Sequence, residues 1–186
     1  MSEKKELTMA EYCQLFEHII LAEYDNLFHN AELRQDLGLD RDTTGPFAVE
    51  YLSAALYLLE DLIPDCPLSE QIRQELVSLV RAHVFRRILP EGTPEGMEAQ
   101  YILYSLKRST EFAQLYARND ETMKKLIENC LKQAKQTDLV SHMPQSVYLM
   151  NLLPGLVQLY CDLLCSVVQA GDAPVCFRIG IPEETR

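Results

Sequence analysis

Hydrophobic residues recur along most of this chain at the three- and four-residue spacing of an amphipathic α-helix. The first such segment spans residues 8–30, where Thr8 and Glu11 form the T-x-x-E pattern of a capping box. Its apolar face carries Met9, Tyr12, Phe16, Ile19, Ile20 and Leu27. Glu23 is the exception, because helical geometry places it in the middle of this apolar face.

Proline- and glycine-rich stretches separate five further helical segments. We predict helices at residues 46–62, 70–89, 95–118, 120–136 and 145–170. Pro46 suits the first turn of the second helix, Ser69 caps the third, and Asn119 or Asp120 caps the fifth. The residues of the second helix that we expect to face solvent are Glu50, Ser53, Glu60 and Asp61.

The sixth segment is apolar enough to raise the question of a membrane span. Its polar residues Asn151, Gln158, Asp162, Ser166 and Gln169, together with Gly155, form one narrow strip along a helix. A lipid-exposed helix has no reason to align its polar groups, and an aspartate in mid-bilayer is costly. We therefore predict no membrane association and expect this segment to be the most buried helix of a bundle, kinked or split at Pro154.

After Gly171 the pattern changes to β-branched and aromatic residues in rough alternation, which indicates an extended segment. The chain is therefore predicted to be all-α, a single-domain bundle of five to six helices at residues 1–171 with a short extended C-terminal tail at 172–186. An isolated strand has no ladder partner, so the tail must dock on the helices, pair across a dimer or remain loose.

Charge is distributed unevenly along the 186 residues. The net charge is −11, and residues 1–75 hold 16 acidic and 5 basic residues, which accounts for the whole excess. Direct nucleic-acid binding is disfavoured, because phosphate contacts require an excess of Lys and Arg. The acidic segment maintains solubility, and it could also meet a basic partner.

The N-terminus shows no apolar signal-peptide pattern, and the six cysteines include no C-x-x-C pair. We expect a cytoplasmic protein with reduced thiols, in which Cys161 and Cys165 fill the core. Neither the cysteines nor the Asp25–His29 pair has the number and spacing of ligands that a metal site in a protein requires. We therefore predict no metal site and no cofactor.

Charged residues that interrupt the apolar faces are the candidates for a ligand site. Glu23 on the first helix and His83 and Arg87 on the third are expected to meet between these helices, as a structural ion pair or as a polar pocket. An anionic ligand would suit His83, Arg87 and Arg73, with Glu23 as the orienting group.

The fourth helix is predicted to have two buried faces. Small residues on one face favour close packing inside the bundle, while Met97, Tyr101, Tyr104 and Leu115 lie on its flank. Tyrosine is enriched at interfaces because it is large and amphipathic, so this flank is a candidate surface for a partner or a second subunit. Burial of both faces within the molecule explains the pattern equally well.

No catalytic motif is recognised: G-x-S-x-G, the Walker A loop and G-x-G-x-x-G are all absent from the sequence. The first hypothesis is a non-enzymatic cytosolic protein that acts through protein–protein interaction or self-association. The alternative is a small-ligand-binding or regulatory bundle that uses the Glu23, His83 and Arg87 pocket. A metal-dependent enzyme comes third, because its ligand motifs are missing.

Overall fold

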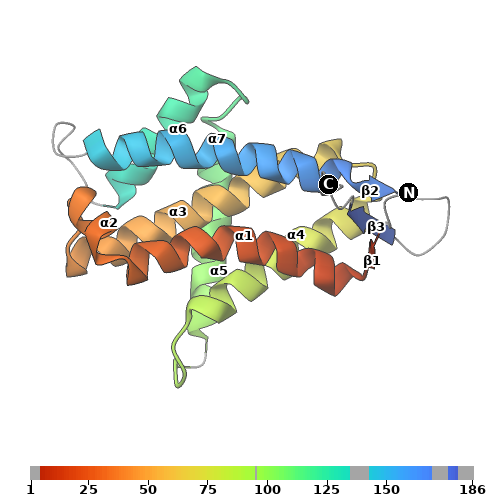
Figure 1. Cartoon of the computed structure of the whole chain (residues 1–186), viewed down its shortest axis with the longest axis horizontal. Helices are drawn as coiled ribbons and strands as arrows, with labels where there is room; N and C mark the ends of the chain where they lie inside the picture. The colour runs from red at the N-terminus through yellow and green to blue at the C-terminus, as the bar shows by residue number, and fades with distance from the viewer. Residues whose placement is uncertain (1–4, 95, 135–142, 169–175, 180–186) are drawn as a thin grey trace, which may run out of the picture.

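The computed structural model describes residues 5–94, 96–134, 143–168 and 176–179, and it confirms the all-α class (Figure 1). Within these residues there are seven α-helices rather than five or six. They are α1 (Met9–His29), α2 (Ala31–Asp36), α3 (Arg41–Leu62), α4 (Glu70–Ile88), α5 (Met97–Ala113), α6 (Asp120–Gln133) and α7 (Met143–Cys165). A 3-10 turn, η1 (Ile63–Asp65), follows α3.

The predicted helix caps are present at three helix starts. The Thr8 hydroxyl accepts from Glu11 N at 3.3 Å, and the Glu11 carboxylate accepts from Thr8 N at 2.8 Å, which completes the capping box of α1. The side chains of Ser69 and Asn119 cap α4 and α6 by accepting from the backbone N–H groups of Ile72 and Thr122. Each cap satisfies backbone N–H groups that have no partner within the helix.

The start of α3 differs from the prediction. The helix begins at Arg41, because the Asp40 carboxylate accepts from the backbone N–H groups of Asp42 and Thr43 at 2.9 and 2.8 Å. Pro46 therefore lies inside the helix rather than in its first turn, and the ladder lacks one N–H there. The short helix α2, capped by Asn30, occupies part of the region predicted as a loop.

Helix α3 is the centre of the fold, since α1, α5, α6 and α7 all pack against it. Residues 50–59 are buried without interruption. The prediction that Glu50 and Ser53 face solvent is therefore wrong: they are 2% and 0% exposed, while Glu60 and Asp61 are half-buried. A helix covered on every side has no outward face to carry a polar stripe.

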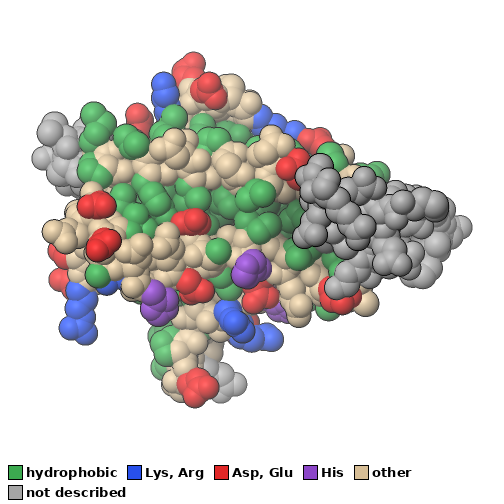
Figure 2. Space-filling model, viewed as in Figure 1, with side chains coloured by type: hydrophobic (Ala, Val, Ile, Leu, Met, Phe, Trp, Pro, Cys, Tyr) green, Lys and Arg blue, Asp and Glu red, His purple; other side chains and the backbone are tan. Residues whose placement is uncertain are grey.

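Helix α7 runs without a break through Pro154. The prediction that it is the most buried helix is wrong, because α3 is the more completely buried of the two. Most of the predicted polar strip of α7 is at the surface, since Asn151, Gly155, Gln158 and Asp162 are exposed. Ser166 lies just after the helix and is half-buried, and Gln169 lies outside the described residues. Among the described residues, α7 is the one helix whose length and composition would allow it to cross a membrane, with 28% of its most apolar window buried. Hydrophobic side chains remain visible between α7 and α1 (Figure 2). The absence of a membrane stays a prediction.

A small antiparallel sheet joins segments from both ends of the sequence. Its strands are β1 (Lys5–Leu7), β2 (Val167–Val168) and β3 (Cys176–Ile179), in the order β1-β3-β2. The extended segment therefore pairs within its own chain, although the partner strand at residues 5–7 was not predicted. The predicted boundary at residue 171 and the rest of the tail lie outside the described residues.

The cysteines of α7 do not fill the core as expected. Cys161 is half-buried and Cys165 is exposed, and both line a small cavity of about 80 Å³ together with Cys66. Among the five cysteines whose burial the structure describes, Cys13, Cys66 and Cys130 are buried, and desolvation raises the pKa of Cys13 and Cys66 to about 11. Core filling is thus the role of these three cysteines.

Candidate functional site

The four residues of the predicted ligand site do not come together. The Glu23 carboxylate accepts from Tyr148 Oη on α7 at 2.9 Å, so the predicted pair with His83 or Arg87 is not formed. His83 Nδ1 instead lies 3.6 Å from Glu17 Oε2. Glu17 and Glu23 are six residues apart and point to different sides of α1, which separates the two groups.

Arg87 and Arg73 also occupy separate places. Arg87 is exposed and lines a shallow pocket of about 310 Å³, with Glu17, His18 and Asp25 of α1 among its walls. Arg73 lies near the other end of α4, where its Nη1 donates to the carbonyl of Pro64 at 2.6 Å. The four predicted residues therefore do not line one common pocket between α1 and α4.

A buried ion pair that the sequence analysis missed connects α3 to α5. Arg108 Nε donates to Glu50 Oε2 at 3.0 Å, and Nη2 lies 2.8 Å from the same oxygen. Both side chains are 2% exposed. Tyr104 Oη donates to the other oxygen, Oε1, so the Glu50 carboxylate has a partner on each side.

Both Nη nitrogens of Arg108 have further partners. Nη1 donates to Glu111 and Nη2 to Asn129 of α6, and the guanidinium carbon lies 4.4 Å from the centre of the Phe112 ring. All three nitrogens of this arginine are hydrogen-bonded. Buried charges are tolerated when they are paired and hydrogen-bonded in this way, so the network holds α3, α5 and α6 together.

Burial has the largest effect on the pKa of both Glu50 and Tyr104. Desolvation raises the pKa of Glu50 above its usual value, despite the hydrogen bond from Tyr104 and the charge of Arg108. Desolvation, followed by the hydrogen bond and the charge of Glu50, raises the pKa of Tyr104. Tyr104 therefore keeps its proton and acts as a donor to Glu50.

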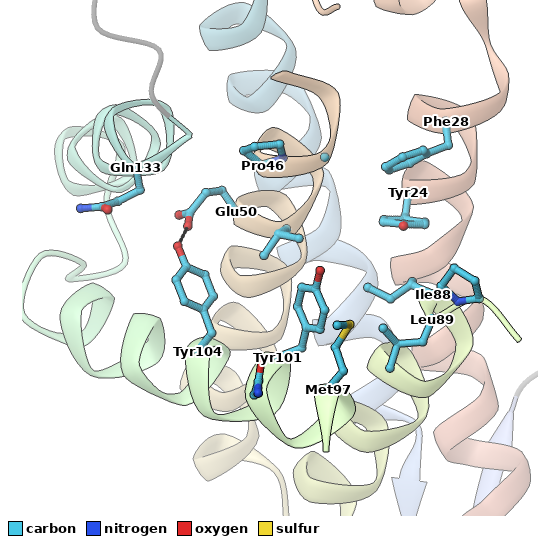
Figure 3. Close-up of a pocket in the computed structure, with 14 residues that line it drawn as sticks. Tyr24, Phe28, Pro46, Glu50, Ile88, Leu89, Met97, Tyr101, Tyr104 and Gln133 are labelled. Atoms are coloured by element: carbon cyan, nitrogen blue, oxygen red, sulfur yellow. Dashed lines mark hydrogen bonds between the residues drawn. The ribbon is translucent and has the colours of Figure 1, made fainter. Parts of the chain in front are cut away.

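An open groove lies directly beside this network. It has a volume of about 690 Å³ and is formed by α1, α3, the end of α4, the following loop and α5, with Gln133 of α6 at its edge. We call it the aromatic groove. Figure 3 shows Tyr24 and Phe28 of α1 on one side of the groove, Tyr101 and Met97 of α5 on a second side, and Pro46 and Glu50 of α3 on a third. Its lining is mainly aromatic and aliphatic.

Three of the four predicted interface residues line the aromatic groove. Met97 and Tyr101 are half-buried, and Tyr104 is 36% exposed. Leu115 is not among the lining residues, because α5 ends at Ala113 and Leu115 lies in the turn beyond it. The flank identified from the sequence is thus one wall of a groove, and the other walls come from α1, α3 and the end of α4.

A second, more polar pocket of about 500 Å³ lies between the end of α3, η1, α4 and α5. Two arginines, Arg73 and Arg81, and two glutamates, Glu60 and Glu70, line it. We call it the Arg73–Arg81 pocket. Its apolar lining residues are Ile63, Pro64, Val77 and Leu106. Of all the residues that line this pocket, Arg73 is the one that the sequence analysis predicted to bind a ligand.

The chain matches no model of a known protein family, no curated protein and no solved structure. Within the part of the chain that the structure describes, no group of three or more His, Cys, Asp or Glu side chains is arranged to hold a metal ion. Proposals on function therefore depend on the shape and chemistry of the two pockets.

Proposed function

We propose that this protein is a non-enzymatic binding protein, whose aromatic groove takes the apolar face of a helix from a protein partner. The observation that carries the proposal is the convergence of Met97, Tyr101 and Tyr104 with Tyr24 and Phe28 in one open groove of about 690 Å³. Aromatic residues and Met are enriched at the centres of protein interfaces.

The groove also suits a helix because it is open and its walls are formed mainly by other helices. Helix-in-groove recognition places two or three apolar anchors of an amphipathic helix between the helices of the receptor. Side chains of α1, α3 and α5 border this groove on three separate sides (Figure 3). Phe28 and Tyr104 are 37% and 36% exposed, so their rings are available for contact.

The charge of the walls favours a basic partner. No Lys or Arg lines the groove among the described residues, and its one charged lining residue is Glu50. Two of its walls, α1 and α3, belong to the segment 1–75 that carries the whole net charge of −11. We infer that the partner helix carries Lys or Arg beside its apolar face, since complementary charge increases association rates and specificity.

Fluorescence anisotropy with two synthetic helical peptides tests this proposal. Both peptides have the same leucine face, and their polar faces carry either lysine or glutamate. The lysine peptide is expected to bind, and Met97→Glu and Tyr101→Ala are each expected to weaken it by about tenfold. Leu103→Glu is the matched control, because Leu103 lies on α5, is 64% exposed and does not line the groove.

Two results contradict the proposal. If neither peptide binds, the groove does not accept a helix. If the control weakens binding as much as Met97→Glu, the peptide adheres to the acidic surface rather than to the groove. Light scattering after size-exclusion chromatography tests whether a second copy of this chain occupies the groove instead. That would be the case if the protein is a dimer and Met97→Glu dissociates it.

A further inference from the structure

The Arg73–Arg81 pocket contains a buried arginine whose hydrogen-bonding capacity is largely unused. Arg81 is 4% exposed, and its Nη2 donates to Glu60 Oε2 at 2.8 Å and to Ser109 Oγ at 3.2 Å. Its Nε is buried without a hydrogen-bond partner, and Nη1 has none among the described residues either. Buried polar groups are rarely left unsatisfied. Because Nε is closed to solvent, a ligand in the pocket cannot reach it, and Nη1 is the nitrogen of Arg81 that remains to donate to a ligand.

Arg73 faces the same pocket with spare donors. It is half-buried, and one of its nitrogens donates to the carbonyl of Pro64. Ser69 and the first turn of α4 lie next to it in sequence, and a helix N-terminus also favours negative charge. Two arginines that converge on one pocket suit a carboxylate, whose oxygens accept charge-assisted hydrogen bonds from guanidinium groups.

The glutamates of the pocket restrict the kind of anion it accepts. The Glu60 side chain is 40% exposed and uses Oε2 for Arg81, which leaves Oε1 without a partner among the described residues. Glu70 is exposed and accepts from Gln74 at 3.0 Å. A phosphate dianion would be repelled by these two carboxylates, whereas an ammonium group would be attracted to them.

We propose that the Arg73–Arg81 pocket binds a free α-amino acid with an apolar side chain. The ligand carboxylate contacts Arg73 and Arg81, its ammonium group contacts Glu60 and Glu70, and its side chain packs against the apolar wall. That wall consists of Ile63, Pro64, Val77 and Leu106. The balanced charge of the lining, with two arginines and two glutamates, matches a zwitterion with no net charge.

Isothermal titration calorimetry on the full chain tests this inference. The ligands, added one at a time, are L-leucine, L-isoleucine, L-valine, L-methionine and L-phenylalanine. At least one is expected to bind with a submillimolar dissociation constant. For the leucine scaffold, 4-methylpentanoate lacks the ammonium group and 3-methylbutylamine lacks the carboxylate. Each is expected to bind at least about tenfold more weakly than the amino acid, because a charge-assisted contact is lost.

Variants locate the site. Arg73→Gln and Arg81→Gln are each expected to weaken binding by about tenfold or more. Arg86→Gln is the matched control on the same helix, because Arg86 is 69% exposed and does not line this pocket. Arg73 is the decisive position if Arg81→Gln fails to fold. Met97→Glu in the aromatic groove is expected to leave amino-acid binding unchanged, so the two proposals fail separately.

Three outcomes overturn the inference. If none of the five amino acids binds, the pocket is not an amino-acid site. If 4-methylpentanoate or inorganic phosphate binds as tightly as the best amino acid, the site recognises an anion and not a zwitterion. If Arg73→Gln binds as well as the unaltered protein, the ligand occupies another place.

Discussion

Helix α3 carries two glutamates that each meet an arginine, and the two pairs differ in how completely the arginine is hydrogen-bonded. Near the start of α3, Glu50 pairs with Arg108, whose three nitrogens all have partners. Near its end, Glu60 pairs with Arg81, of which one nitrogen has partners within the described residues. In the first pair every guanidinium nitrogen is hydrogen-bonded within the protein, whereas in the second pair Arg81 has N–H donors left for a ligand. Breaking each pair in turn measures this difference.

The largest effect is expected from Arg108→Met. The substitution leaves the Glu50 carboxylate buried without its counterion, which lowers the free energy of unfolding by about 3–5 kcal/mol. Urea denaturation with linear extrapolation measures it. The double variant Glu50→Gln with Arg108→Met is the control, and it should recover much of the loss because neither charge is then stranded. A loss below about 1 kcal/mol in the single variant would show that water reaches Glu50.

A smaller effect is expected from Arg81→Met. Its partner Glu60 has a side chain that is 40% exposed, so water can solvate the carboxylate when the arginine is removed. The expected loss is about 1–2 kcal/mol, from two hydrogen bonds and altered packing. A loss equal to that of Arg108→Met would make Arg81 an equally structural residue and would remove the contrast between the pairs.

The pH dependence of stability distinguishes Glu50 further. Its pKa is raised in the folded protein, so its contribution to stability is full below the ordinary value of 4.5 and is lost as the pH rises through the folded value. Relative to Glu50→Gln, the unaltered protein should therefore lose stability as the pH rises from 4.5 through the folded pKa of Glu50. Asp40→Asn is a control of opposite sign, because hydrogen bonds from Thr43 lower the pKa of Asp40 and its contribution is lost as the pH falls.

The smallest effect is expected from Arg86→Gln. This arginine pairs with Glu98 at 3.3 Å, and its side chain is 69% exposed. Surface pairs of this kind contribute less than about 1 kcal/mol, so the free energy of unfolding should change by about 0.5 kcal/mol or less. A larger change, measured by the same urea titration, would mean that the loop between α4 and α5 depends on this contact.

The sequence allowed α1, α4 and α6 to be placed with caps at the correct residues, because capping depends on side chains within a few positions of the helix end. It did not allow α3 to be oriented. A helix buried on all sides shows no clean polar stripe, so Glu50 was assigned to solvent. Strand β1 could not be predicted either, because three residues gain strand structure only from a partner more than 160 positions away.

The candidate site was predictable in part. Met97, Tyr101 and Tyr104 lie on one flank of a single helix, and helical periodicity is enough to group them. The walls of the groove from α1 and α3 depend on how separate helices pack together. The spacing of residues within one helix does not predict that packing. One clue was available for Arg108: it lies three residues after Ser105 and four before Phe112, on the face that faces the core. A charged residue in that position indicates a buried partner on a facing helix.

The small sheet has a consequence for synthesis of the chain. Residues 5–7 are synthesised before their partner residues 176–179, which are added more than 160 positions later. At about 5–20 residues per second, the first strand waits roughly 10–30 s before its partner exists. During that interval its backbone is open to any other nascent edge nearby. Closure of β1 on β3 is thus a late step, completed after the helices between them have been made.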